Sequence, residues 1–263
     1  MDFQNVKLIK KIGLIAAVLM HGSLFAQQGE FRLGFQVNPG IAWMTTNDLG
    51  ISNVGTNLTV GIAAQGELGI SDQLAIATGM GLTFNRGGKL RHETGGNFFP
   101  QSRLSNDAYN SGPKPLPDGT KLKYSLQYLE FPFALKWRPP ENGLMRYYVE
   151  APVLTWCFTL QRRGAIKAGD INTEKEDISK DVNPFNISLG IGGGLEYAMG
   201  QKTSLVAGLS FHRGLLDITS DNATTATPNP DDNPFDPNDD YILHKEDAHA
   251  ALNTIVVRIG ILF

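Results

Sequence analysis

The chain has 263 residues, and all-β barrels of more than about 200 residues commonly form one domain of this length. Its 23 Lys and Arg residues against 26 Asp and Glu residues give a formal net charge of −3 without a basic stripe, which excludes a nucleic-acid partner. Cys157 is the only cysteine, so the sequence excludes an intrachain disulfide and a multi-cysteine metal site.

The N-terminal segment has the pattern of a secretory signal peptide. Three lysines among the first eleven residues precede an apolar stretch, 12–20, which is too short to span a bilayer. Ala26 provides a small residue before a predicted cleavage at Gln27. We therefore expect residues 1–26 to be removed on export and residues 27–263 to form a single domain.

Eight later segments alternate apolar and polar residues with the period of two that is typical of a β-strand. In the first segment, Phe31, Leu33 and Phe35 share one face, whereas Arg32 and Gly34 share the other. The segments are 31–43, 58–70, 74–84, 123–137, 146–160, 187–197, 204–215 and 254–263. The pattern predicts eight strands, most of them with one apolar face.

Two of these strands depart from a simple alternation. The fourth changes phase near Tyr128, which predicts a β-bulge there. The fifth, 146–160, is apolar on both faces, so the sequence leaves open which of its residues face inward.

The connections between the strands alternate in length. Those after the second, fourth and sixth strands are short turns, at 71–73, 139–143 and 200–202, and the others are longer. No stretch reaches the roughly 20 consecutive apolar residues of a membrane-spanning helix, so a spanning structure must be a closed barrel that satisfies every backbone N–H and C=O group in lipid. Short periplasmic turns and long external loops are typical of outer-membrane barrels. We predict an all-β fold, a single eight-stranded antiparallel transmembrane β-barrel with an up-and-down meander and long extracellular loops.

Aromatic residues fall where two membrane interfaces would lie. Those beside the short turns are Trp137, Tyr147, Tyr197 and Phe263, and those towards the long loops are Trp43, Phe84 and Phe211. Such girdles are typical of membrane barrels. The alternative, a soluble barrel with an aromatic core, would leave the glycine-rich face on the surface, and glycine is a poor surface residue for a strand.

Several segments resemble the PorT-like outer-membrane β-barrel family of Bacteroidetes. They are 128–136 (YLEFPFALK), 189–197 (LGIGGGLEY), 214–218 (GLLDI) and the terminal aromatic strand. The resemblance implies an outer-membrane barrel, and the member that gives the family its name is linked to protein secretion. The stretch 150–152 (EAP) departs from the pattern, because similar sequences more often have glycine before the proline.

The polar face of the predicted barrel carries three acids and three bases. They are Arg32, Glu67, Glu130, Lys136, Glu196 and Arg258. The interior of an eight-stranded barrel is only wide enough for its own side chains, and buried charges must pair. We therefore expect an internal charge network that plugs the barrel, in preference to an ion pathway.

A catalytic or metal-binding role is the alternative to a purely structural interior. Ser210 and His212 share one face of the seventh strand, and Asp217 follows it, but no nucleophile-elbow motif accompanies them. The last loop holds an oxygen-rich set, Asp231, Asp232, Asn233, Asp236, Asn238, Asp239 and Asp240, and a second set, His244, Glu246, Asp247 and His249. Neither set has the spacing of a calcium or zinc site. We expect no catalytic residues, no cofactor and no bound metal.

We predict a non-enzymatic barrel of the cell outer membrane with a structural, assembly or secretion-associated role. The alternative is a surface binding or adhesion protein that acts through long polar loops at 87–120 and 221–247. Its partners would be outer-membrane lipid, lipopolysaccharide and the barrel assembly machinery, with Phe263 as the C-terminal assembly signal.

Overall fold

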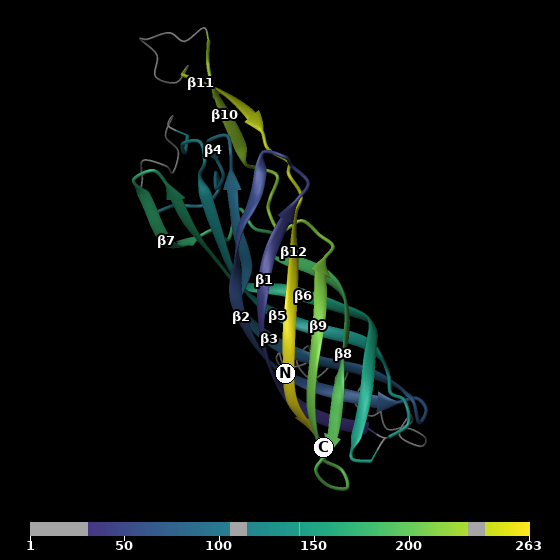
Figure 1. Cartoon of the computed structure of the whole chain (residues 1–263). Helices are drawn as coiled ribbons and strands as arrows, with labels where there is room; N and C mark the ends of the chain where they lie inside the picture. The colour runs from purple at the N-terminus through teal and green to yellow at the C-terminus, as the bar shows by residue number, and fades with distance from the viewer. Residues whose placement is uncertain (1–30, 106–114, 142, 231–239) are drawn as a thin grey trace, which may run out of the picture.

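Eight antiparallel strands close into a barrel in the computed structural model, which describes residues 31–105, 115–141, 143–230 and 240–263 (Figure 1). In ring order they are β1 (Phe31–Thr46), β2 (Ile51–Gly69), β3 (Leu74–His92), β5 (Lys121–Trp137), β6 (Met145–Ala168), β8 (Phe185–Ala198), β9 (Ser204–Gly214) and β12 (Ala250–Leu262). The ring closes where β12 pairs with β1. The predicted all-β meander is therefore confirmed, whereas the predicted signal peptide, 1–26, lies outside the described residues.

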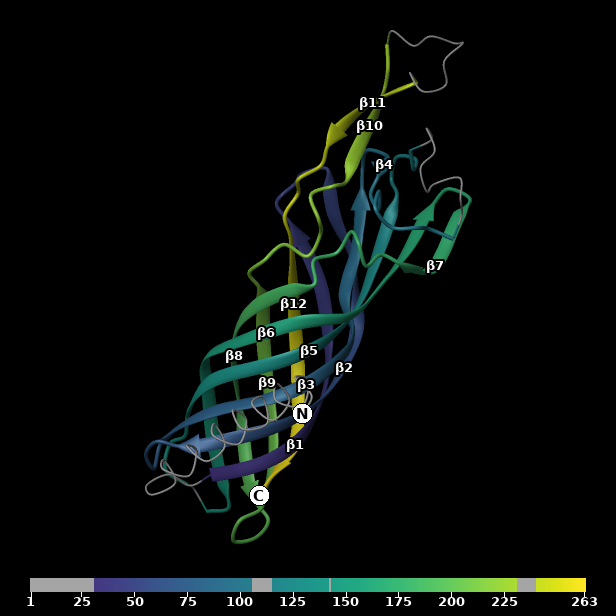
Figure 2. The same cartoon turned by 180° about the vertical axis from the view of Figure 1, so that it is seen from behind.

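The two ends of the barrel differ. Short turns connect β2 to β3, β5 to β6 and β8 to β9 at one end, where the C-terminus also lies (Figure 1). The other end carries four further strands, which are β4 (Gly96–Asn97), β7 (Ile171–Asp177), β10 (Thr224–Pro228) and β11 (Tyr241–Lys245). Strands β11, β10 and β4 form a separate small sheet that projects beyond the barrel (Figure 2). We call the structure formed by β4, β7, β10, β11 and their connecting loops, at the end opposite the short turns, the cap.

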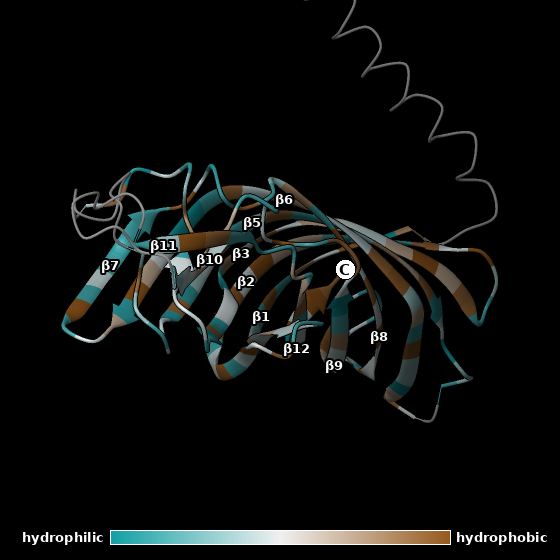
Figure 3. Cartoon of the chain, turned by 90° about the horizontal axis from the view of Figure 1, so that it is seen from above, coloured by the Kyte–Doolittle hydropathy of each residue, from teal (hydrophilic) through white to brown (hydrophobic). Residues whose placement is uncertain are grey.

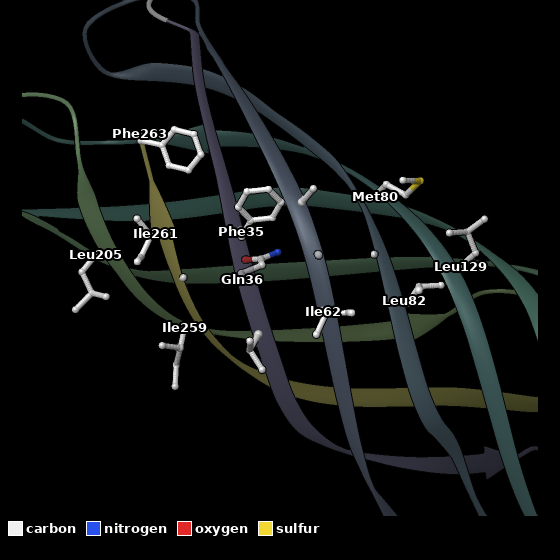
Figure 4. Close-up of a pocket in the computed structure, with 15 residues that line it drawn as sticks. Phe35, Gln36, Ile62, Met80, Leu82, Leu129, Leu205, Ile259, Ile261 and Phe263 are labelled. Atoms are coloured by element: carbon white, nitrogen blue, oxygen red, sulfur yellow. The ribbon is translucent and has the colours of Figure 1, made fainter.

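A belt of exposed apolar side chains surrounds the lower part of the barrel. Its members include Phe35, Leu58, Ile62, Met80, Phe133, Val149, Leu189, Ile191, Leu209 and Ile259. The alternation that places them outside is visible as bands of colour along the barrel strands (Figure 3). Apolar side chains of β12, β1, β2 and β3 line an open hollow of about 770 Å³ on this outer surface (Figure 4). Water would solvate such a belt poorly, whereas lipid matches it. Within the described residues, no helix is long and apolar enough to cross a membrane.

The barrel strands continue beyond the belt, where the polarity of the two faces is reversed. In β5, Leu122, Tyr124 and Leu126 point inward and are buried, while Lys121 and Lys123 point outward. Even-numbered residues of β5 are buried from Leu122 to Tyr128 and again at Ala134 and Lys136, whereas 129–132 are all half-buried. The irregularity predicted near Tyr128 is present in the pairing of β5 with both of its neighbours.

The register shifts at this level involve the two neighbours of β5. On one side the pairing with β3 shifts between Thr83 and Arg86, where Asn85 has a φ of 58°. On the other side, Gln127 pairs with Gln161 but Tyr128 pairs with Thr159, so β6 has the additional residue. A second shift in β6 falls between Glu150 and Val153. Each bulge reverses which residues face inward, which explains why the sequence of β6 shows no single phase.

The expectation that 87–120 is an exposed polar loop is wrong for much of its length. Its first part belongs to β3, which ends at His92. Four apolar residues further along are buried inside the cap, namely Phe98, Phe99, Leu104 and Leu116. They pack in one apolar cluster with inward residues of the barrel strands above the belt, such as Leu122 of β5. Above the apolar belt the outer face of these strands is polar, so the interior supplies the hydrophobic core.

We predict that Ile259→Arg destabilises the barrel in lipid by about 2 to 4 kcal/mol, because it places a charge in the middle of the apolar belt. The measurement is the urea midpoint of the purified protein in lipid vesicles. Ile259→Leu is the matched control and should leave the midpoint unchanged. An Ile259→Arg variant as stable as the original protein would contradict the assignment of this surface to lipid.

Candidate functional site

Four of the six charged residues that the sequence placed inside the barrel lie together near its turn end. Lys136 contacts Glu67, and its Nζ atom is 2.6 Å from Glu196 Oε1. Arg32 Nη1 lies 2.7 Å from Glu196 Oε2, and Arg138 Nη1 lies 3.3 Å from Glu67 Oε2. Lys136 is fully buried at 0% exposure, so its charge depends on these carboxylates. We call these five residues the lower cluster.

The other two predicted residues lie higher in the lumen, and each pairs with a residue outside the predicted set. Arg258 forms an ion pair with Glu150. Glu130 forms an ion pair with Arg86, whose Nε atom also donates a hydrogen bond of 3.0 Å to Thr254 Oγ1. The charges thus occupy three levels, and each acid among these residues has a basic partner.

Sequence reasoning missed Arg86, Arg138 and Glu150. The alternation did contain a signal for Arg138, which follows Lys136 by two residues and so shares its face. The other two lie beside bulges that alternation alone does not reveal. Asn85, with its positive φ, turns Arg86 inward although it follows the outward Phe84 by two residues.

Glycines on the inward face make room for the large side chains of the lumen. A Cβ atom at Gly208 would lie 2.2 Å from the hydroxyl oxygen of Tyr148, and one at Gly194 would lie 2.8 Å from the same atom. The ring of Tyr148 also lies against Lys136, with 4.1 Å between Nζ and the ring centroid. The glycine-rich pattern of β8 and β9 therefore reflects packing inside the barrel.

The middle of the lumen contains the serine and histidine that we considered as a catalytic pair. His212 Nε2 lies 3.1 Å from Ser210 Oγ. Asp217 does not complete a triad, because its Oδ1 atom accepts hydrogen bonds from Thr219 and from the backbone of Ala250. The cavity beside the pair measures about 70 Å³, whereas pockets for small molecules have volumes of roughly 300 Å³ or more. The pair has no space for a substrate.

The cap closes the other end of the lumen with an apolar core. Phe99 packs edge-on against Tyr124, with 5.9 Å between ring centroids. His92 stacks on Phe98 at a centroid distance of 4.0 Å and is 4% exposed. This burial lowers the pKa of His92 to about 4, although the negative charge of Asp48 acts in the opposite direction. His92 is thus a neutral member of the cap core at pH 7.

The metal-site candidates of the last loop fall in two regions. Residues 231–239 lie outside the described part of the chain. His244 lies in β11, and Glu246 accepts a hydrogen bond of 3.1 Å from the backbone N–H of Ala248. Among the described residues, no group of three or more His, Cys, Asp or Glu side chains is arranged to hold a metal ion.

Comparison with known proteins gives distant structural likenesses only. No protein-family model and no curated protein matches the chain. Neisserial surface protein A has 9% sequence identity and a TM-score of 0.43, with 90% of this chain and 98% of that chain covered. The outer-membrane protein OprG of Pseudomonas aeruginosa has 8% identity and a TM-score of 0.40, with 89% and 96% covered. The attachment invasion locus protein Ail of Yersinia pestis has 9% identity and a TM-score of 0.33, with 89% and 99% covered. These likenesses are too distant to indicate a function.

We expect the lower cluster to depend more on its two carboxylates than on any one of its three cations. Glu67→Gln leaves three cations with one carboxylate and should cost about 3 to 5 kcal/mol of unfolding free energy, measured by urea titration in vesicles. Lys136→Met leaves two cations with two carboxylates and should cost clearly less. Adding Lys136→Met to Glu67→Gln should restore part of the loss. Equal effects of the two single substitutions would contradict the inference that the two carboxylates hold the three cations together.

Proposed function

We propose that this protein is an integral outer-membrane β-barrel without enzymatic activity, which acts at the cell surface through its cap. The observation that carries the proposal is the inversion of polarity along the barrel. Inside the apolar belt the lumen is charged, and beyond the belt the lumen is apolar. This inversion suits a barrel whose lower part is in lipid and whose upper part is in water.

The filled lumen argues against transport as the main activity. Ion pairs occupy it at three levels, and the apolar core of the cap follows above them. The lack of space beside Ser210 and His212 likewise supports a non-enzymatic role. A barrel whose lumen is filled by ion pairs and by the core of the cap can still act through surfaces outside the membrane or as a rigid scaffold.

The orientation follows from the two ends of the barrel. We infer that the short turns and Phe263 face the periplasm, because short periplasmic turns are typical of outer-membrane barrels. Phe263 is half exposed on the lipid side, and its ring centroid is 6.3 Å from that of Phe35. This position is suitable for an aromatic C-terminal signal that the barrel assembly machinery reads. Export would depend on the signal peptide predicted at 1–26.

A structural, assembly or secretion-associated role is the finer form of the proposal. It rests on the resemblance of 128–136 and 189–197 to PorT-like barrels of Bacteroidetes. The two segments belong to β5 and β8, which supply Glu130, Lys136 and Glu196 to the lumen. The resemblance therefore falls on residues that hold the barrel together, and it leaves the partner of the cap open.

We expect the reconstituted protein to show no large stable conductance in planar bilayers, because charged side chains fill its lumen. In intact cells, an added protease should cut the cap and leave the short turns uncut. Antibody epitopes inserted at 169–170, between β6 and β7, and at 200–202 would report the two sides. A porin-like current would contradict the sealed lumen, and recovery of the protein as a soluble periplasmic species would contradict membrane insertion.

A surface-binding role is the second candidate, and the projecting hairpin favours it. All five residues of β11 are exposed, and Leu243 reaches 61%. Glu246 donates a backbone hydrogen bond of 2.9 Å to Ala223. Hydrogen-bonded pairs alternate along an antiparallel ladder, so the backbone groups of Tyr241, Leu243 and Lys245 point to the open edge. Within the described residues no further strand covers that edge, and such an edge can accept an extended segment of another protein.

Replacing 224–245 by a two-residue Asn-Gly turn tests this second candidate. The barrel should remain intact, with unchanged heat-modifiable migration in gels, while adherence of cells that display the protein should fall to the level of cells that lack it. A control replaces 200–202 at the opposite end with the same turn. Full adherence after removal of the hairpin would favour the structural role.

A further inference from the structure

We propose that a basic surface on the outer face of β3, β5 and β6 binds the phosphate groups of a phosphorylated glycolipid, the lipopolysaccharide of the outer leaflet. We call this surface the basic ladder. Its residues are Lys89, Arg91, Lys121, Lys123 and Lys167. The inference rests on the outer-membrane location proposed above, and it assigns that barrel a specific lipid partner.

The sheet register places these cations directly beside one another. Arg91 pairs with Lys121, and Lys121 pairs with Lys167, which gives one row of three cations across three adjacent strands. Lys89 pairs with Lys123 in a second row. Directly opposite residues have Cβ atoms only about 4.5 to 5.5 Å apart, so like charges in these positions repel one another.

All five side chains point out of the barrel. On β5 the alternating partners of Lys121 and Lys123 are the buried Leu122 and Tyr124. On β3 the buried Leu90 lies between Lys89 and Arg91, both of which are exposed. On β6 the exposed Lys167 lies between two buried residues. The closed sheet therefore holds the cations on one face and prevents them from moving apart.

No ion pair within the described residues neutralises the basic ladder. The outward neighbours on β2 are uncharged, since Arg91 pairs with Ser52 and Lys89 pairs with Gly55. Four acids lie near the upper end of the rows, Glu93, Asp118, Asp170 and the exposed Glu174 of the neighbouring β7, and none is in salt-bridge contact with these cations within the described residues. Repulsion among these cations raises the free energy of the unliganded protein. An anion that bridges the rows would relieve this repulsion and so lower the free energy.

The height of the basic ladder identifies the source of the anion. Lys89 follows the lipid-facing Phe84 by five residues. One of these five residues is the additional residue of the β3 bulge, so about four steps of 3.3 Å at a strand tilt of roughly 40° place it about 10 Å beyond the apolar belt. That level holds the sugars and phosphates of a glycolipid leaflet. Cations near an anionic membrane surface gain affinity from each added charge, so a fixed row of them favours a multiply phosphorylated headgroup.

The test uses the full-length protein in detergent micelles with purified lipopolysaccharide as the probe. One variant neutralises the three-cation row with Arg91→Gln, Lys121→Gln and Lys167→Gln. A matched control neutralises three exposed cations elsewhere with Arg103→Gln, Lys180→Gln and Lys202→Gln. We expect the row variant to bind roughly 100-fold more weakly, since each of its three cations contributes about a fivefold step at an anionic surface. The control should bind as the original protein does.

Stability without lipid provides a second measurement. The row variant should melt at the same temperature as the original protein or higher, because its like-charge neighbours have been removed, and lipopolysaccharide should raise the melting temperature of the original protein only. This outcome also shows that the row variant folds. A row variant that melts lower without lipid would overturn the claim that repulsion is relieved by an anion.

Three further outcomes would overturn the proposal. Equal affinity for enzymatically dephosphorylated lipopolysaccharide would exclude phosphate recognition. Inorganic phosphate that competes at the concentration of the lipid phosphate would assign the site to free phosphate. Equal loss of binding in the control variant would reduce the effect to net charge. If lipopolysaccharide binding fails while cell fractionation still places the protein in the outer membrane, only the basic ladder is wrong, and the proposed location stands.

Discussion

A backbone N–H group that faces lipid has no water to bind, so each strand in the belt must find its partners in two neighbouring strands. Closure of β12 on β1 meets this requirement and sets every other feature of the molecule. It fixes which residues face inward, and it removes them from both lipid and bulk water. Charged inward residues must then find partners within a narrow lumen, and they do so at three levels.

Much of this architecture could be predicted from the sequence, because alternation, turn chemistry and loop spacing are local. The alternation predicts all eight barrel strands but stops short of most of their cap ends; β2 begins at Ile51 rather than at 58, and β3 continues to His92 rather than to 84. The interior positions of Arg32 and Lys136 followed from period two alone. Arg86 and Glu150 did not, since a single inserted residue reverses the phase of a strand and leaves no reliable mark on hydropathy.

The cap shows a different limit of sequence reasoning. The polarity pattern of a strand indicates which of its faces is apolar. It does not indicate whether that apolar face points into the protein or towards lipid. Tyr124 and Phe133 lie on opposite faces of one strand, yet both look like members of an apolar face. The same ambiguity concealed the basic ladder, because Lys121 and Lys123 are separated in sequence from Lys89 and Lys167 and become neighbours only through the register.

The lower cluster also bears on how the barrel is built. Four of its members come from β1, β2, β5 and β8, which are spread around the ring, and Arg138 directly follows β5. In an open sheet Arg32 and Glu196 are separated by most of the chain, and each must keep its own hydration. Their charges become mutually satisfied only when the two edges meet, so the electrostatic gain arrives in one step at closure. A half-built barrel lacks this gain, so the electrostatics favour the closed ring over partly assembled states.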